Sequence, residues 1–164
     1  MSILSYIIFL YIIIYILMML RVSVLFRKTN TIKKEKSFTD GIKISVIIPF
    51  RNEAGNIEKC VQSILGQKTT VDFEIILVND HSEDNFSRVF ESDKIRLIDL
   101  ENSELGKKKA INIGIELSTG NIILTTDADC IVSENWIDAV ASSFNDDKIQ
   151  MSIGSVYIEE NGKL

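Results

Sequence analysis

Two aspartates, Asp127 and Asp129, are separated by a single residue and follow directly after an apolar run. Alternate side chains of an extended segment point the same way, so the two carboxylates can converge on one cation. Hard ions such as Mg²⁺ and Mn²⁺ prefer oxygen ligands and keep positions open for phosphate oxygens, which neutralises a diphosphate leaving group. The alternative is a solvated acidic turn, because this spacing is common by chance. If the polar ends of other strands lie opposite these two aspartates, the pair predicts a metal site.

Polar side chains also follow two earlier apolar runs. The sequence Pro-Phe-Arg-Asn-Glu occupies 49–53, and Asn-Asp-His-Ser occupies 79–82. In the second of these, Asp80 offers up to about four lone-pair sites to the N–H and O–H donors of a nucleobase or ribose. Its alternative role is to cap the following helix, which Ser82 can also do. His81 is the only histidine of the chain and is assigned no chemistry.

A glycine followed by three lysines, Gly106 to Lys109, precedes an apparent helix. Mobile cationic side chains and free N–H groups at a helix start can bind a pyrophosphate. The alternative is a basic, solvated helix start. Neither G-x-x-x-x-G-K-S/T nor G-x-G-x-x-G occurs in the chain, which disfavours P-loop and dinucleotide-binding proteins.

The elements that position these residues follow from the hydrophobic pattern. From Ile42 onward, short β-rich runs alternate with segments of helical period, which predicts an α/β fold with a mainly parallel sheet and helices on both faces. The predicted strands are Ile42–Ile48, ended by Pro49, then Phe73–Val78, Ile95–Leu100, Asn121–Thr126 and a last strand near Gln150–Ile158. The predicted helices are Ile57–Leu65 with Asn56 as N-cap and Gly66 as stop, Glu83–Phe90, Lys107–Leu117 and Glu134–Phe144. Ligands of open α/β sheets bind beyond the carboxyl ends of the strands, so the polar segments are expected to meet at one edge.

The N-terminal segment Ile3–Leu20 contains no charged residue. As a helix it would be about 27 Å long, close to the hydrocarbon thickness of a bilayer, and Val22–Phe26 can extend it. The alternative is a cleaved signal peptide, but no basic residue precedes the run and no A-x-A-like site follows it. Arginines and lysines lie on its C-terminal side, and such positive flanks stay cytoplasmic. We therefore expect a single-pass cell-membrane anchor and flank at 1–28, a polar linker at 29–41 that can also touch anionic headgroups, and a cytoplasmic domain at 42–164.

Length and charge limit the other possibilities. With 164 residues the chain has room for one domain of ordinary size. Its net charge of −5 excludes a typical nucleic-acid binder, because such proteins concentrate Lys and Arg. Cys60 and Cys130 form neither a disulfide framework nor a zinc pattern and are expected to be reduced thiols.

Four segments in this order resemble glycosyltransferase family 2, whose members share a nucleotide-diphospho-sugar-binding fold called GT-A. The segments are Ser45-Val-Ile-Ile-Pro-Phe-Arg-Asn-Glu53, Ile76-Leu-Val-Asn-Asp-His-Ser82, Gly106-Lys-Lys-Lys-Ala-Ile-Asn112 and Gly120-Asn-Ile-Ile-Leu-Thr-Thr-Asp-Ala-Asp129. The resemblance as a whole covers about Ile42 to Ile158. Four matches in sequence are far more specific than any one alone.

The resemblance implies roles for the polar residues. The residues implied to bind the donor are Pro49, Arg51 and Asp80 around the nucleoside, Glu53 close by, Lys107 near the diphosphate, and Asp127 at the ribose or phosphates. Asp129 would be the more direct ligand of a divalent metal, Mn²⁺ or Mg²⁺, with Asp127 beside it. The donor would be a UDP- or GDP-sugar.

The resemblance also implies a reaction. The family transfers sugar with inversion, using a carboxylate to deprotonate the acceptor hydroxyl. With the anchor, this predicts a glycan or lipid-linked acceptor at the membrane and the building of a polysaccharide, glycolipid or lipid-linked saccharide. The family's base lies well downstream of the D-x-D pair, so Glu159 and Glu160 come too early and the base is expected beyond Leu164. This fragment alone is then expected to bind donor without competent transfer. The alternative is a non-catalytic, membrane-anchored protein that binds nucleotide-sugar or assembles with an enzyme.

Overall fold

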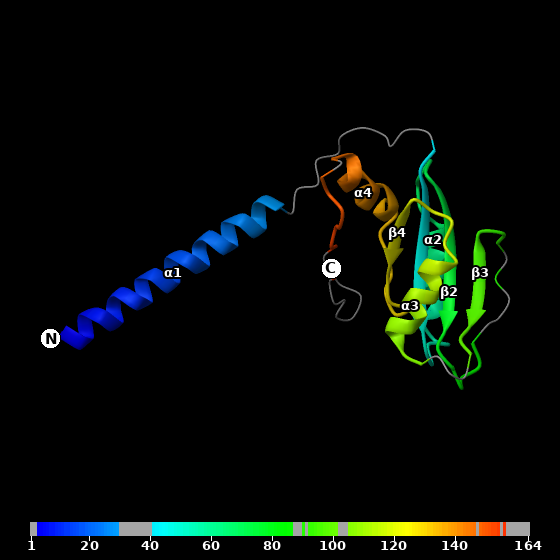
Figure 1. Cartoon of the computed structure of the whole chain (residues 1–164), viewed down its shortest axis with the longest axis horizontal. Coiled ribbons are helices and arrows are strands. Elements are labelled where there is room, and N and C mark those ends of the chain that lie inside the picture. The colour runs from blue at the N-terminus through cyan, green and yellow to red at the C-terminus, as the bar shows by residue number, and fades with distance from the viewer. Residues whose placement is uncertain are drawn as a thin grey trace. The chain divides into compact units, whose positions relative to one another are not determined.

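The computed structural model describes residues 3–29, 41–86, 90, 92–101, 105–146, 148–154 and 156 (Figure 1). The chain divides into two units, Met1–Glu35 and Lys36–Leu164, which we call the N-terminal unit and the sheet unit. Each is described by itself. The predicted polar linker at 29–41 lies, apart from its two end residues, outside the described part of the chain.

The N-terminal unit contains one helix, α1, at Ile3–Thr29. Its segment Ile3–Val24 has 22 residues and a mean hydropathy of 2.7, and none of its most apolar window is buried. At a rise of 1.5 Å per residue, 22 residues extend over about 33 Å, enough to cross a bilayer. The predicted helix is confirmed as a candidate span, and a signal sequence meets the same criteria of length and composition.

The sheet unit is built on four parallel strands in the order β3-β2-β1-β4 (Figure 1). The strands are β1 at Lys43–Phe50, β2 at Asp72–Asn79, β3 at Ile95–Asp99 and β4 at Ile122–Thr125. The helices are α2 at Ile57–Leu65, α3 at Lys107–Glu116 and α4 at Trp136–Ser142, followed by the 3-10 turn η1 at Ser143–Asn145. Because all four strands are parallel, their carboxyl ends lie at one edge of the sheet.

Helices cover both faces of this sheet, as the sequence predicts. Alternate residues of β1 point to opposite faces. Val46 and Ile48 are fully buried against α2 and α4, whereas Ile47 is fully buried on the face covered by α3. Strands buried on both faces read as continuous apolar runs, which is why β1 and β2 are recognisable in the sequence.

The prediction that Pro49 ends the first strand is wrong, because Pro49 lies within this strand. β1 continues through Phe50, and Pro49 is paired in register with Val78 of β2. The carbonyl of Ile47 accepts from Thr126 on the β4 side, so Pro49, two residues further, also faces that side. β4 has ended at Thr125, and the missing N–H of proline therefore removes no ladder hydrogen bond.

Two predicted elements differ from the structure. Residues 83–86 of the helix predicted at Glu83–Phe90 are not helical, and 87–89 lie outside the described residues. Here local polar groups bind the loop after β1 instead: Glu83 N–H donates to Asn52 Oδ1 (2.8 Å) and Asp84 Oδ2 accepts from Ala54 N–H (2.7 Å). The described residues of the last predicted strand, 150–154 and 156, form no strand. The predicted N-cap Asn56 makes no side-chain cap: its backbone lies in the αR region, unlike that of a typical N-cap, and its amide donates to Glu53 Oε2 (2.8 Å).

Candidate functional site

A pocket of about 220 Å³ lies at the carboxyl edge of the sheet. It is lined by Pro49, Phe50, Arg51, Glu53, Asp80, Lys107, Asp127, Ala128 and Asp129. All seven residues selected from the sequence are among these nine. The structure therefore brings together the ends of β1, β2 and β4 with the start of α3, while the role of each side chain remains a prediction.

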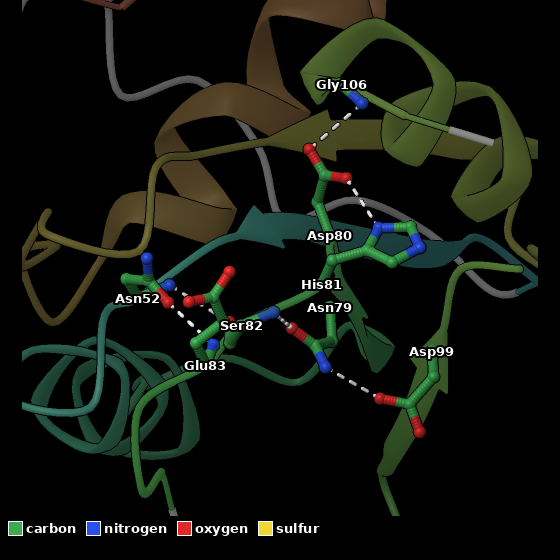
Figure 2. Close-up of polar contacts among 8 residues, drawn as sticks. All are labelled: Asn52, Asn79, Asp80, His81, Ser82, Glu83, Asp99 and Gly106. Carbon is green, nitrogen blue, oxygen red and sulfur yellow. Dashed lines mark hydrogen bonds and ion pairs between the residues drawn. The ribbon is translucent and has the colours of Figure 1, made fainter. Parts of the chain in front are cut away.

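Asp80 is the most buried acidic group of the pocket, with 7% of the residue exposed. Its N–H donates to Phe50 O (2.8 Å), which extends the β1–β2 pairing by one residue. Its Oδ2 accepts from Gly106 N–H at 3.0 Å, and its Oδ1 lies 3.1 Å from His81 Nδ1 (Figure 2). The alternative role as a helix cap is not seen among the described residues, since the carboxylate holds the loop before α3. Two of its roughly four lone-pair sites are thus left for a ligand.

Gly106 joins this loop to α3 in a conformation that requires glycine. Its φ of 96° and ψ of 153° lie in a region that other residues hardly occupy. Its carbonyl accepts from Lys109 N–H (2.9 Å) and Ala110 N–H (3.1 Å), which begins the helix. Among the residues that the structure describes, no side chain caps this helix start, so the amides of Lys107 and Lys108 form a site suited to an anion.

Lys107 is not a free cation at the helix start. Its Nζ lies 2.5 Å from Asp127 Oδ1, and both side chains are more than half exposed. The ion pair connects the start of α3 to the end of β4 across the pocket. As an exposed pair it adds little to stability, which leaves both groups available to a ligand.

The D-x-D segment forms a turn and not the extended segment from which we predicted convergence. Cys130 N–H donates to Asp127 O (3.2 Å), and Ala128 is buried with 3% exposed. The buried methyl group fixes the turn, while Asp127 and Asp129 are exposed and line the same pocket. The two carboxylates therefore share one pocket for a different geometrical reason.

The side chain of Cys60 in α2 contacts the main chain of this turn. Its Sγ lies 3.5 Å from Asp127 O. Burial, and then the negative charges of Cys130, Asp129 and Asp127, raise the pKa of the Cys60 thiol to about 12. The group therefore remains a protonated thiol that can donate to the carbonyl, in accord with the predicted reduced state.

The oxygen donors suit a hard divalent ion completed by other ligands. Within the described ranges, no group of three His, Cys, Asp or Glu side chains could hold a metal ion. Two carboxylates alone match the habit of Mg²⁺ and Mn²⁺ of keeping several positions for water and phosphate oxygens. The residues present therefore fit an ion that is bound jointly with a phosphorylated ligand.

Sequence reasoning missed the residues that brace the strand-end loops. Asn79, with 5% exposed, accepts from Ser82 N–H (2.9 Å) and donates to Asp99 Oδ1 (2.7 Å). Ser82 Oγ accepts from Asn52 N–H (2.9 Å), which ties the two loops together (Figure 2). Asn52 and His81 both have positive φ, 57° and 58°. The sequence feature that could have indicated these positive φ angles is the presence of Asn and His, two residue types that are enriched in this conformation.

Arg51 and Glu53 complete the pocket from the loop after β1. Arg51 is exposed. Glu53 O accepts from Asn56 N–H and Ile57 N–H, both at 2.9 Å, which starts α2. The loop is thereby fixed between β1 and α2, with the Arg51 side chain available to a ligand.

Comparison with known proteins gives matches over the same region. The model of the family "Glycosyl transferase family 2" matches residues 45–163. Two curated relatives are the glycosyltransferase GlyG of Streptococcus pneumoniae, 34% identical over 119 residues, and the glycosyltransferase AglE of Haloferax volcanii, 31% identical over 119 residues. These alignments include 70% and 69% of this chain, and the chain spans 39% of the length of each relative.

Solved structures share the fold. TarS of S. aureus in complex with UDP-GlcNAc superimposes with a TM-score of 0.54 and 22% identity, over 63% of this chain and 31% of that one. The mannosyltransferase PcManGT of Pyrobaculum calidifontis, in complex with GDP-Man and Mn²⁺, superimposes with a TM-score of 0.53 and 22% identity, over 68% and 36%. At this identity the likeness establishes a GT-A-like fold for the sheet unit.

Proposed function

Because the chain belongs to glycosyl transferase family 2, we propose that it binds a nucleotide-diphospho-sugar and takes part in transfer of the sugar to an acceptor. The chain spans less than half the length of its curated relatives, so the activity of the whole protein is part of this proposal. The observation that carries it is the pocket in which seven polar or loop residues from four segments gather. The bound donors of the two solved structures, UDP-GlcNAc and GDP-Man, support a UDP- or GDP-sugar.

In this proposal the pocket is divided between nucleoside and diphosphate. Asp80 accepts hydrogen bonds from the nucleoside, with Pro49, Arg51 and Glu53 around it. Lys107 and the open amides of α3 bind the diphosphate, since both supply positive charge to phosphate oxygens. Asp127 approaches the ribose or the phosphates, and its ion pair with Lys107 supports a place beside the diphosphate.

We assign Asp129 and Asp127 to a divalent ion, Mn²⁺ or Mg²⁺. These two side chains would hold the ion, and the ion would supply positive charge that offsets the negative charge of a diphosphate leaving group. The Mn²⁺ bound in the mannosyltransferase complex supports this assignment. The carboxylates on a turn fixed by buried Ala128 would keep their positions without donor.

The proposed acceptor and location are supported by α1 as a candidate membrane span. A membrane anchor would keep the pocket near a glycan or lipid-linked acceptor at the cytoplasmic surface of the cell membrane. Transfer with inversion further needs a carboxylate base at the acceptor hydroxyl. We assign the role of this base to none of the seven pocket residues that were selected from the sequence.

Calorimetric titration of the whole chain in detergent with UDP-GlcNAc and GDP-mannose tests the proposal. With Mn²⁺ we expect binding of one of these donors that is lost with excess EDTA. Asp129→Ala should weaken it at least about tenfold, the effect of losing one charged interaction. Asp72→Ala is the matched control, since Asp72 is exposed at the opposite edge, at the start of β2. Unaltered binding in Asp129→Ala would contradict the metal assignment. Failure of all nucleotide-sugars to bind would contradict the proposed function.

A further inference from the structure

His81, to which the sequence assigned no role, directly contacts the buried acid of the pocket. Its Nδ1 lies 3.1 Å from Asp80 Oδ1, and 23% of its side chain is exposed (Figure 2). A carboxylate can only accept hydrogen bonds, so Nδ1 must carry the hydrogen. The ring therefore donates to Asp80.

The second ring nitrogen defines the tautomer. His81 Nε2 is buried and has no hydrogen-bond partner in the part of the chain that the structure describes. A hydrogen on Nε2 would be a buried N–H without an acceptor, and such orphaned donors are rarer than under-satisfied acceptors. The neutral ring with the hydrogen on Nδ1 fits both observations.

The backbone of His81 has a conformation that is unfavourable for most residues with a side chain. Its φ of 58° lies in the left-handed region, which glycine adopts without steric cost and a residue with a Cβ does not. Backbone strain of this kind persists where the surroundings over-determine it, commonly at functional sites. Here the side chain reaches one residue back to the acid at the pocket.

The other carboxylate oxygen is held from the opposite direction. Asp80 Oδ2 accepts from Gly106 N–H (3.0 Å) of the loop before α3. With one donor on each oxygen, the carboxylate cannot rotate without losing a hydrogen bond. Asp80 lines the pocket, so the remaining lone pairs of its carboxylate are available to a ligand there.

We infer that His81 is a positioning residue, which with the Gly106 amide fixes the Asp80 carboxylate so that its free lone pairs accept from the N–H and O–H groups of a nucleoside. This inference rests on the proposed function, since it assigns Asp80 to the nucleoside end of the donor. Beyond that function, nucleoside affinity depends on the hydrogen bond from His81 Nδ1 to Asp80 Oδ1.

Two substitutions separate positioning from a purely structural role. His81→Gly relieves the backbone and removes the donor, so we expect the midpoint of urea unfolding to stay equal or rise while affinity for UDP or GDP falls about tenfold, the effect of one hydrogen bond to a charged group. His81→Asn keeps an N–H at the δ position and tolerates positive φ, so its affinity should stay within about threefold of the wild type. Affinity for Mn²⁺ alone, followed by its electron paramagnetic resonance signal, should be unchanged in both.

The tautomer provides a readout that needs no ligand. In ¹⁵N-histidine-labelled whole chain, the single imidazole should give one protonated Nδ1 signal and one unprotonated Nε2 signal, and Asp80→Asn should shift the Nδ1 proton. A hydrogen on Nε2 overturns the inference whether or not nucleotide binds. A chemical shift of the Nδ1 proton that does not change in Asp80→Asn overturns it as well. Wild-type affinity in His81→Gly overturns it too. Absence of nucleotide binding to the wild type, with the expected tautomer, contradicts the proposed function alone.

Discussion

Successive residues at the start of α3 hold the two acids that lie at different strand ends. The amide of Gly106 binds Asp80 after β2, and the ammonium group of Lys107 binds Asp127 after β4. The start of α3 therefore contacts both acids, through a main-chain amide at Asp80 and through a side-chain ammonium group at Asp127. A change in this backbone should reach both ends of the pocket.

Gly106→Ala tests this dependence. Among the described residues, apart from the two chain neighbours of Gly106, no heavy atom lies within 4 Å of where the added Cβ would be, so the cost is conformational and not steric. At φ 96° and ψ 153° we expect a loss of about 1–3 kcal/mol in the free energy of unfolding. If the backbone relaxes, the Asp80 contact lengthens and nucleotide-sugar affinity falls as well. Urea unfolding followed by the fluorescence of Trp136, together with donor titration, measures both effects.

Gly55→Ala is the control for this prediction. The Cβ of an alanine at 55 also has no heavy atom of the described residues within 4 Å, apart from its chain neighbours, and φ of Gly55 is not in the left-handed region. We expect a change of at most about 0.5 kcal/mol, as for an ordinary surface substitution. Equal effects of the two substitutions would show that the conformation of Gly106 is not what matters.

At the residue scale, the sequence predicted which side chains gather but not how they are held. Asp80, Asp127 and Asp129 were found because parallel strands bring their carboxyl ends to one edge. The pairing of Lys107 with Asp127 depends on side-chain torsions that no spacing rule contains. The role of His81 depends on a positive φ, which a single sequence cannot specify.

At the scale of elements, α3 approaches β1 closely because Gly114 has no side chain. A Cβ at 114 would lie 2.5 Å from Cγ2 of Ile47, which is fully buried. Gly114→Ala should therefore destabilise the sheet unit by about 1–3 kcal/mol, although alanine is the better helix former by about 1 kcal/mol. Urea unfolding of the two proteins gives the difference.

A double-mutant cycle identifies the cause. In an Ile47→Ala background the clash is absent, so adding Gly114→Ala should cost less than it does in the wild type. Ile115→Ala on the exposed side of the same helix should change stability by no more than about 0.5 kcal/mol. Additive costs in the cycle would argue against the close approach of α3 and β1.

Glu74 links three elements at the edge of the sheet opposite the pocket. Its Oε1 accepts from Ser45 Oγ (2.6 Å), Thr119 N–H (2.7 Å) and Thr119 Oγ1 (2.7 Å). Burial alone would raise the pKa of Glu74, but these hydrogen bonds lower it below its ordinary value of 4.5. The ionised group thus fixes the turn between α3 and β4.

This lowered pKa predicts a pH-dependent contribution to stability. A carboxyl whose pKa is lower in the folded state stabilises above pH 4.5, and the contribution is lost as pH falls through the folded pKa. Glu74→Gln keeps an acceptor oxygen without the charge, so it should cost about 1 kcal/mol at pH 7. The difference from the wild type should shrink below pH 4.5 and vanish below the folded pKa. A difference that is constant from pH 7 to pH 3 would contradict this account.

The elements themselves were largely readable from the sequence. Buried parallel strands appear as apolar runs, and helices α2 and α3 were predicted within one residue of their ends. Pro49 was misread because the shortness of β4, which removes the need for its N–H, is not visible in the sequence. The helix expected at 83 was replaced at 83–86 by hydrogen bonds to a loop about 30 residues earlier, and such long-range competition overrides local propensity.

At the scale of the whole molecule, the sheet unit has its own core, and the residues that line the pocket belong to this unit. A helix whose apolar side chains are exposed to this extent needs another environment to cover them. We expect that environment to be the bilayer. Folding and donor binding of the sheet unit should then be separable from membrane attachment.

Deletion of residues 3–24 tests this separation. The whole chain should remain with the membrane fraction after an alkaline carbonate wash and keep its N-terminal residues by mass spectrometry, as expected of an uncleaved anchor. The deleted form should be soluble and bind nucleotide-sugar within about twofold of the whole chain, since the residues that line the pocket belong to the sheet unit. As a milder control, Ile13→Arg places a charge near the centre of the span at a cost of about 2.5–3.5 kcal/mol and should weaken membrane retention without changing affinity. A wild-type chain that is washed off, or one shortened at its N-terminus, would rule out the anchor while leaving the pocket assignment intact.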